Sequence, residues 1–487
     1  MERLFVSLLL CAFVLFHCVS GHQTKQIEIT EGPRLNKGRM SATLASIKRP
    51  NGNIYVIGGA PSEQNFVPHT GTNAIEVLRP PYTKWEFSNI SVPYPLAGNA
   101  YILPDGRVLV YASIFAFNPK STRTEVGQDP NNPNAPDAGP VSAVIIDLDA
   151  GSVTPIYRPK DNTPCGAPLK GSLGLVQRAF AKSIQLKDGT ILRLGSFGYY
   201  VDPNPTAKCE ESKCVYCLDG TCKADENFQY GCHEVKDCPN KEGTWHLQVG
   251  DMIEIYTPPT NKQSLGTVKC IKMDAGRTSL DAIQLQDGRV LITGGWGPEG
   301  DGVNQSYGTT YFLDSKTATL TPGPRMLEPR EDHSTAMLED GRILVTGGTV
   351  GSGKTVKSTE IFSPQKGIFE YGDDMQFSRE DHFSMYLGPL IMFVGGEVAD
   401  KADQIRNTAA FFNRKTGAYI SPQFLYSRPE NGALEAGLAG ISDGAGVHLD
   451  DNTILLFGGQ QGYQDRDGEY ISAGIGTIRT LLVKYNP

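Results

Sequence analysis

The stretch DGRVLITGG at residues 287–295 returns almost unchanged as DGRILVTGG at residues 340–348. Five looser copies complete the set: NGNIYVIGG at 51–59, DGRVLVYAS at 105–113, DGTILRLGS at 188–196, GPLIMFVGG at 388–396 and DNTILLFGG at 451–459. The copies start 54, 83, 99, 53, 48 and 63 residues apart. A phrase that recurs at this spacing is the signature of a repeat architecture, with a unit of about 50 residues and insertions in two copies.

Each copy has the same physical interpretation. The opening Asp-Gly or Asn-Gly predicts a tight hairpin turn, because these residues tolerate positive φ. The apolar run after it is rich in Val, Ile and Leu and predicts a strand buried on both faces. The Gly pair that ends five copies lets the backbone turn sharply or approach a neighbour closely. With one strand before the turn, such as 334–338, and two after the Gly pair, each repeat has four antiparallel strands.

A single four-stranded sheet cannot bury both of its faces, whereas sheets arranged radially around an axis can, as in a β-propeller. The turn, the apolar strand, the Gly pair and the Arg-x-x-His of Arg330/His333 and Arg379/His382 resemble kelch repeats. The resemblance covers essentially the whole of residues 22–487. It implies an all-β, seven-bladed kelch-type β-propeller, similar to the central domain of galactose oxidase.

The two ends of the repeat array predict how the ring closes. After its Gly pair the last repeat has only one further strand, so its fourth strand is missing. Residues 27–34, IEITEGPR, resemble the outer strand that ends in LTPGPR at 320–325. We therefore expect the N-terminal segment to complete the seventh blade.

The composition limits the class of protein. Of 487 residues, 39% are apolar and 20% are charged, and 45 basic against 53 acidic residues give a net charge of -8. An acidic chain argues against nucleic-acid binding, since phosphate contacts need clustered Lys and Arg. With 20 Phe and 20 Tyr to fill cores, the chain does not have the composition of a disordered polymer.

Residues 1–21 have the pattern of a secretory signal peptide. Arg3 precedes an apolar stretch at 4–16, and Val19-Ser20-Gly21 supplies a cleavage position. A helix over that stretch would rise only about 20 Å, which is short of a bilayer core of roughly 30 Å. No later stretch is long and apolar enough to span a membrane. The sequence therefore predicts a secreted, extracellular protein with a single propeller at 22–487.

Eight cysteines follow the signal peptide, and an even number in an exported chain predicts disulfides whose pairing the sequence leaves open. They are Cys165, Cys209, Cys214, Cys217, Cys222, Cys232, Cys238 and Cys270. Six of them fall in an insertion at 197–250 within the third blade. A second C-x-x-C at zinc-finger spacing is missing, so disulfides are favoured over zinc. Asn89 and Asn304 begin glycosylation sequons.

Two neighbouring repeats carry the same tetrapeptide, Arg-Glu-Asp-His, at the start of the innermost strand. The candidate ligand-binding side chains near the ring axis are Arg330, Asp332, His333, Arg379, Asp381 and His382. The Arg and His residues have an alternative role as kelch framework that hydrogen-bonds between blades, and for the two His residues this alternative is favoured. The two Asp residues are more informative, because nothing in the repeat requires a carboxylate there.

The resemblance to galactose oxidase and the glyoxal oxidases raises copper-radical chemistry. Those enzymes place Tyr and Tyr-His at the equivalent strand openings, with the radical Tyr cross-linked to a Cys. Here the matching positions hold Asp332-His333 and Asp381-His382, and no cysteine falls at the start of an inner strand. The sequence therefore predicts no metal ion and no other cofactor.

The loops that follow the nine-residue phrase carry nearly all of the insertions, and in a propeller they share one rim. Loops on a rigid scaffold carry function more often than their supports do. We therefore expect extracellular recognition of a glycan or protein ligand through this face, with no nucleic acid and no membrane span. The alternative is a carbohydrate-active enzyme, of the oxidase or epimerase type, with Asp332 and Asp381 as acid, base or metal ligands in an axial site.

Overall fold

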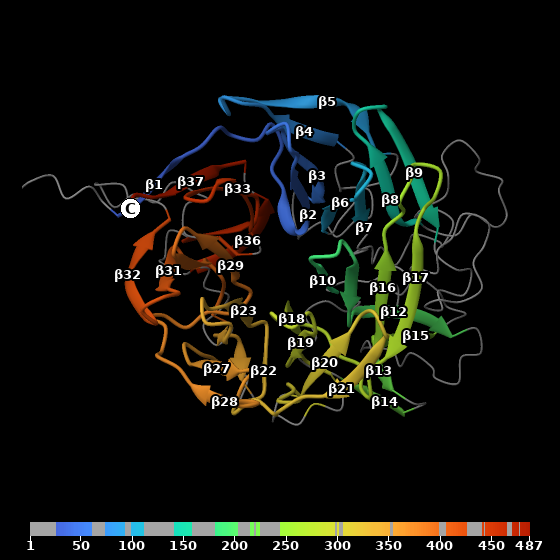
Figure 1. The fold of residues 1–487 in the computed structure, drawn as a ribbon, viewed down its shortest axis with the longest axis vertical. Coiled ribbons are helices and arrows are strands. Elements are labelled where there is room, and N and C mark those ends of the chain that lie inside the picture. Colours follow the sequence, from blue (N-terminus) through green and yellow to red (C-terminus); the bar gives the residue numbers. More distant parts are fainter. Residues whose placement is uncertain are drawn as a thin grey trace, which may run out of the picture.

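Figure 1 looks down the axis of a closed ring of β-sheets. The computed structural model describes residues 26–60, 74–92, 99–111, 141–157, 181–202, 215–218, 221–224, 244–297, 300, 305–350, 354–398, 406–425, 441–442, 444–464, 470–476 and 478–487. In these ranges every regular element is a strand, and seven sheets each have four antiparallel strands. The predicted all-β, seven-bladed propeller is confirmed.

Each blade runs from an inner strand at the axis to an outer strand at the rim (Figure 1). Blades 1 to 3 consist of β2 (Met40–Lys48), β3 (Ile54–Ala60), β4 (Ala74–Leu78) and β5 (Trp85–Ser91); β6 (Ala100–Ile102), β7 (Val108–Tyr111), β8 (Val141–Asp147) and β9 (Ser152–Tyr157); and β10 (Lys182–Gln185), β11 (Ile191–Leu194), β16 (Met252–Thr257) and β17 (Thr267–Lys272). Blades 4 to 6 consist of β18 (Asp281–Gln284), β19 (Val290–Thr293), β20 (Thr310–Asp314) and β21 (Thr319–Pro322); β23 (Ser334–Met337), β24 (Ile343–Thr346), β27 (Thr359–Ser363) and β28 (Ile368–Tyr371); and β29 (Phe383–Leu387), β30 (Leu390–Val394), β31 (Thr408–Asn413) and β32 (Ala418–Phe424).

Blade 7 is assembled from both ends of the chain. Its strands, from the axis outward, are β33 (Ala445–Asp450), β34 (Thr453–Phe457), β37 (Thr480–Tyr485) and β1 (Ile27–Glu31). β1 pairs with β37 in antiparallel register, and the amide of Gly32 continues the pairing by donating to the carbonyl of Thr480 at 2.9 Å. The predicted closure by the N-terminal segment is confirmed.

The hydrophobic core is divided into seven layers, one between each pair of adjacent blades. The second strand of each blade makes this possible because its side chains alternate between the two neighbours. In β7, Val108 and Val110 pack toward blade 1, while Leu109 and Tyr111 pack toward blade 3. The strand after each turn is therefore apolar at most positions, as the repeated phrase predicts, with polar exceptions such as Arg193 in β11 and the last residues of β19 and β24.

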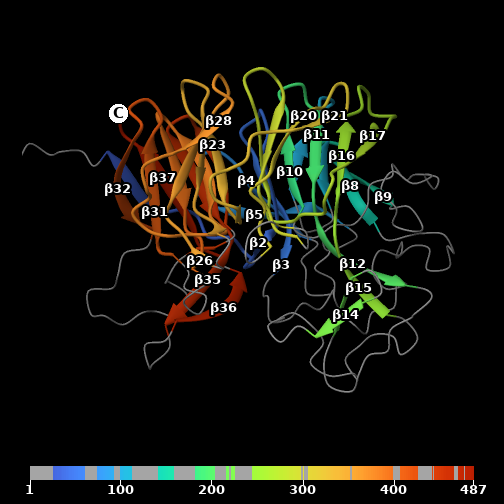
Figure 2. The same ribbon diagram turned by 90° about the horizontal axis from the view of Figure 1, so that it is seen from below.

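Most of the additional short strands lie in the connections that follow the second strand of a blade, whereas β22 precedes the inner strand of blade 5. They are β12 (Phe197–Asp202) with β15 (Thr244–Val249), β13 (Val215–Leu218) with β14 (Thr221–Ala224), β25 (Thr349–Val350) between β22 (Arg330–Glu331) and β26 (Lys354–Thr355), and β35 (Gln460–Gln464) with β36 (Tyr470–Gly476). Figure 2 shows β14, β15, β35 and β36 projecting from the same side of the ring. This side, which is at the bottom of Figure 2, also bears the starts of the inner strands; we call it the upper face of the propeller.

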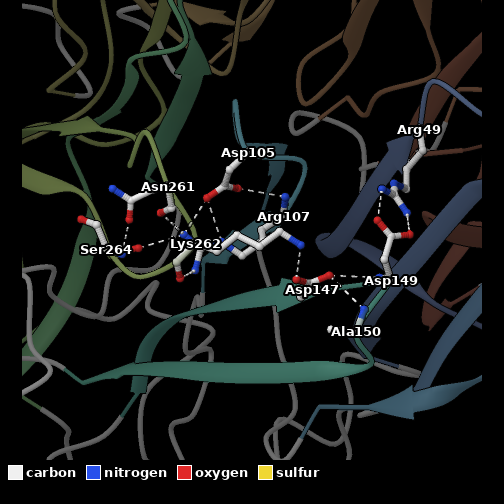
Figure 3. A network of polar contacts seen from close by, with 9 residues as sticks. All are labelled: Arg49, Asp105, Arg107, Asp147, Asp149, Ala150, Asn261, Lys262 and Ser264. Atoms are coloured by element: carbon white, nitrogen blue, oxygen red, sulfur yellow. Dashed lines mark hydrogen bonds and ion pairs between the residues drawn. The ribbon is translucent and has the colours of Figure 1, made fainter.

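The turns between strands are fastened by ion pairs that link blades 1, 2 and 3 (Figure 3). Arg107 binds Asp105 at 2.7 Å and donates to three carbonyl groups of the loop 261–264 between β16 and β17. In the same network Lys262 binds Asp147 at 2.5 Å, and Arg49 binds Asp149 at 2.6 Å. Every cation here has a carboxylate partner within the protein, so this network is an inter-blade clamp.

Several sequence predictions concern residues of which the structure describes little or nothing. Residues 1–21, Asn304 and Cys165, Cys209, Cys214, Cys232 and Cys238 lie outside the described residues. Cys217 and Cys222 are opposite each other in the β13–β14 register, and Cys270 on β17 is disulfide-bonded. Asn89 is exposed on the outer strand β5. Within the described ranges, no helix is long and apolar enough to cross a membrane.

Candidate functional site

Three adjacent blades place a residue with left-handed backbone near the ring axis. Ser279, Asp332 and Asp381 have φ angles of 52°, 51° and 49°, and each lies two residues before its inner strand. Residues other than glycine adopt this region at a cost of about 1 kcal/mol or more. The three residues lie where the inner strands start, beside the ring axis on the upper face, a place that we call the axial mouth. Strained positions cluster at functional sites, so these three residues mark a candidate site.

Backbone hydrogen bonds join these three residues from blade to blade. The amide of Asp332 donates to the carbonyl of Ser279 at 3.0 Å, and the amide of Asp381 donates to the carbonyl of Asp332 at 3.1 Å. The Gly pairs support this arc from behind. A Cβ at Gly348 or Gly396 would lie 2.2 or 2.3 Å from the carbonyl oxygen of the residue that precedes Asp332 or Asp381. Because Gly348 and Gly396 have no Cβ, the segments that carry Asp332 and Asp381 can pack directly against the ends of the second strands.

The carboxyl groups of Asp332 and Asp381 meet in a hydrogen bond. Burial within the ring raises the pKa of Asp332, and hydrogen bonds with the side chains of Ser279 and Asp381 offset only part of the rise. Asp381 is nevertheless exposed to solvent and Asp332 is partly exposed, so solvent reaches both residues. Two carboxyl groups in contact share a proton, because the second ionisation is opposed by the first.

A second polar group lies beside the pair, on the inner strands of blades 3 to 5. Asp281 at the start of β18 is buried, and the ammonium group of Lys182 lies 2.5 Å from its Oδ1. The amide and hydroxyl of Thr335 donate to its Oδ2 at 2.6 and 2.8 Å. Burial acts to raise the pKa of Asp281, but Lys182 and the other partners outweigh it and hold the pKa below its usual value. Asp281 is therefore an ionised bridge between three blades.

Sequence reasoning missed Ser279, Asp281 and Lys182. The repeat itself could have located Ser279. Asp332 lies eight residues before Asp340, the first residue of its repeated phrase, and Ser279 lies eight residues before Asp287, the first residue of the preceding phrase. Nothing in the sequence singles out Lys182, whose partner lies 99 residues further along the chain.

The two histidines occupy equivalent positions between blades. His333 Nε2 lies 2.8 Å from the hydroxyl of Thr293, and His382 Nε2 lies 3.0 Å from the hydroxyl of Thr346, each in the preceding blade. Burial lowers the pKa of His333 to about 3 and lowers that of His382 as well. Both rings are therefore neutral at physiological pH, in the arrangement that the framework alternative describes.

The two arginines are fully buried and lie within their own blades. Arg330 binds Glu360 on β27 at 2.9 Å, whereas Arg379 donates to the carbonyls of Gly395 and Thr408 at 2.6 and 3.0 Å. Of the six predicted residues, the structure thus brings the two aspartates together at the mouth and places the Arg and His residues behind them. A role of those four in ligand binding stays a prediction.

The residues of this site do not fit the copper centre of the galactose oxidases. The described openings of the inner strands of blades 4 to 6 carry Ser279, Asp332 and Asp381, where a tyrosine would be needed. The Nε2 atoms of both histidines are engaged by threonine hydroxyls. In the described part of the chain, no three His, Cys, Asp or Glu side chains are grouped so that they could hold a metal ion.

No family model and no curated protein matches the chain. Solved structures with a similar fold include a fungal alcohol oxidase of the AA5 family, described as catalytically diverse and in complex with copper. The likeness has a TM-score of 0.53 at 13% identity and covers 94% of this chain and 76% of that chain. At this identity the comparison establishes the fold, which agrees with the resemblance to galactose oxidase.

This comparison contradicts the prediction of a propeller whose role is recognition alone. The structure that the chain resembles along nearly its whole length is that of an enzyme. The prediction placed function in the long loops of the rim, whereas the strained residues and the contacting carboxyl groups lie at the axis. The expectation of a pure recognition module is therefore wrong, and the findings favour the alternative hypothesis of an enzyme.

Proposed function

We propose that the chain is a carbohydrate-active enzyme of the epimerase type, which opens and recloses the hemiacetal ring of a sugar at Asp332 and Asp381. The observation that carries the proposal is the contact between two carboxyl groups at the axial mouth, one of them with a raised pKa. Two titratable groups whose environments separate their pKa values are the recurring basis of paired acid and base roles.

Ring opening needs one proton donor and one proton acceptor. The ionised carboxylate accepts the proton of the anomeric hydroxyl while the protonated carboxyl donates a proton to the ring oxygen, and the bond between the anomeric carbon and the ring oxygen breaks. The open-chain aldehyde then recloses on its other face by the reverse transfers. The pair ends each cycle with the one proton it started with, and nothing is oxidised or reduced.

The donor set favours the epimerase type over the oxidase type of the alternative. An oxidase must pass two electrons from the substrate alcohol to an acceptor, and the similar fungal oxidase is in complex with copper. In this chain the strand openings carry carboxylates and a hydroxyl, which are groups that exchange protons. The mechanism above uses only the groups found at the mouth.

The proposal includes secretion and the full set of disulfides. The signal-peptide pattern at 1–21 and the disulfide-bonded Cys270 support it. The exposed position of Asn89 on β5 is compatible with a glycan there. The substrate is then a free sugar outside the cell.

The test adds the purified mature chain to anomerically pure sugars and measures the rate of anomer exchange by polarimetry or proton NMR. We expect a rate well above that of buffer, reduced by about 100-fold or more in Asp332→Asn and Asp381→Asn. Asp373→Asn is the matched control, because Asp373 is exposed and lies outside the pair. No acceleration with any pentose, hexose or uronic acid would refute the epimerase type. Hydrogen peroxide released by a copper-supplemented sample would indicate the oxidase type instead.

A further inference from the structure

Blade 4 places a serine where blades 5 and 6 place their aspartates. We propose that Ser279 is a positioning residue of the axial site: its hydroxyl donates to the carboxylate of Asp332, which fixes the orientation of that carboxyl group and favours its ionised form. The role in catalysis rests on the proposed function, whereas the hydrogen bond and its effect on Asp332 do not.

The backbone that carries Ser279 is held in one position. The amide of Thr278 donates to the carbonyl of Trp296, and the amide of Trp296 donates to the carbonyl of Thr278, both at 2.8 Å. The residue before each aspartate is paired within its own blade in the same way. A Cβ at Gly295 would lie 2.6 Å from the carbonyl oxygen of Thr278, so this glycine permits the close packing. Ser279 is therefore presented to the axis by the same backbone frame as the two aspartates.

Two contacts join Ser279 to Asp332 across the boundary between blades 4 and 5. The carbonyl of Ser279 accepts from the amide of Asp332 at 3.0 Å, and the side chain of Ser279 hydrogen-bonds with the carboxyl group of Asp332. A backbone contact and a side-chain contact with the same residue restrict the rotation of its carboxyl group. A hydrogen bond donated to the ionised form of an acid lowers its pKa, and this bond offsets part of the rise that burial causes at Asp332.

The backbone conformation does not by itself require a serine. With a φ of 52°, Ser279 lies in the left-handed region, which glycine, asparagine and aspartate adopt more readily. Compared with glycine, serine adds a hydroxyl group; compared with aspartate, it lacks a charge. A neutral donor stabilises a neighbouring carboxylate, whereas a third carboxyl group would oppose its ionisation. The chemistry of a serine at this position is therefore the chemistry that an ionised Asp332 needs.

Substitutions at position 279 leave the other groups around Asp332 in place. The charged or titratable residues in its own segment and in the segments that line the mouth beside it are Arg330, Glu331 and His333, Asp381 in blade 6, and the ion pair of Asp281 with Lys182 in blades 4 and 3. Their effects on the carboxyl group are common to the protein and to every variant of residue 279. A difference between these variants therefore reports the side chain at that position.

The experiment replaces Ser279 by three residues that tolerate left-handed backbone. The titration of Asp332 is followed by NMR of the folded protein with carbon-13 in the aspartate carboxyl groups, and Asp332→Asn identifies its signal. Ser279→Gly removes the hydroxyl and should raise the midpoint of Asp332 by on the order of one pH unit. Ser279→Asp should raise it at least as much, because it adds a like charge. Ser279→Asn supplies an amide donor and should raise the midpoint less than Ser279→Gly does.

Ala318→Gly is the matched control. Ala318 also has left-handed backbone, with a φ of 57°, but it lies in the turn between β20 and β21. The control relieves a similar backbone strain without removing a hydrogen bond to Asp332, so the midpoint of Asp332 should stay unchanged. Melting temperatures verify that every variant is folded. A merely structural serine would change the melting temperature alone, so a midpoint in Ser279→Gly that is no higher than in the control would overturn the proposal.

Anomer exchange separates this proposal from the proposed function. If the axial pair catalyses the exchange, the limb of the pH–rate profile that belongs to Asp332 should move in Ser279→Gly by the same amount and in the same direction as the midpoint. The expected midpoints without any exchange by the unsubstituted protein would refute the proposed function and leave the effect of Ser279 on Asp332 standing. Exchange with an unmoved midpoint would refute the role of Ser279 alone.

Discussion

Blades 5 and 6 begin their inner strands with the same four residues, and the two copies have almost the same backbone. Asp332 and Asp381 have φ angles within 2° of each other, and both histidines bind a threonine of the preceding blade. The environments of the arginines differ, because Arg330 is paired with carboxylates and Arg379 with carbonyls. A repeat thus sets where a side chain lies, while its partner on the third strand sets the charge around it.

Other blades extend this comparison. In blade 1, Arg39 binds Glu76 at 2.8 Å with both side chains fully buried. In blade 4, Arg277 lies over the ring of Tyr307 at 4.0 Å and donates to the hydroxyl of Tyr311 at 3.0 Å. Of these four buried arginines, Arg39 and Arg330 bind carboxylates, Arg277 contacts tyrosine side chains and Arg379 donates to backbone carbonyls. Arg277 also lies 3.9 Å from Asp274, so within the described residues Arg379 is the one of these four arginines without a carboxylate partner.

The largest expected effect separates the two arginines. Arg330→Ala leaves Glu360 buried without its partner and should lower the free energy of unfolding by about 3–5 kcal/mol. Arg379→Ala leaves only neutral carbonyls unpaired and should cost less, about 1–3 kcal/mol. Urea denaturation at neutral pH measures both. An equal or larger loss in Arg379→Ala would show that the carbonyl cage is as strong as the ion pair.

A second effect should be alike in the two blades. Burial holds the folded pKa of each histidine below its unfolded value of about 6.5, and that of His333 is about 3, so stability is lost as the pH falls below about 6.5. At pH 5 each should cost about 2 kcal/mol relative to neutral pH. Thermal unfolding between pH 4 and 8 should therefore show a flatter acid limb in His333→Gln and in His382→Gln. A change in only one variant would break the equivalence.

Two aspartates near the axis should respond in opposite directions. Asp281 has a lowered pKa, so its contribution is present at neutral pH and is lost as the pH falls below about 4. Asp281→Asn should therefore cost about 2 kcal/mol at pH 7 and less at pH 3. Asp332 has a raised pKa, so its ionisation opposes folding as the pH rises. Asp332→Asn should therefore be as stable as the unsubstituted protein or more stable at pH 7. Melting curves at both pH values provide the measurement, and a melting temperature lowered by several degrees would contradict an axial site.

The smallest expected effect concerns the hydroxyls that hold the histidines. Thr293→Val and Thr346→Val keep the shape of the side chain and remove one buried hydrogen bond, at a cost of about 1 kcal/mol each. Chemical denaturation of the two variants side by side is the measurement. The two losses should agree within experimental error because the geometries match, with distances of 2.8 and 3.0 Å.

The sequence by itself determined the ring: the phrase repeated seven times contains the turn and the two-faced strand, and in five copies the Gly pair, which are local features that need no distant partner. It also placed Asp332 and Asp381 at equivalent openings. Only the tertiary structure decided that Ser279 joins them, that Lys182 holds Asp281 in its ionised form, and that Arg379 has carbonyl rather than carboxylate partners among the described residues. These depend on partners in other strands and blades, between 29 and 99 residues away, which local pattern does not specify. The ionisation state of a side chain depends on the groups near it in space, whereas the fold of each blade depends on residues that are near one another in the chain.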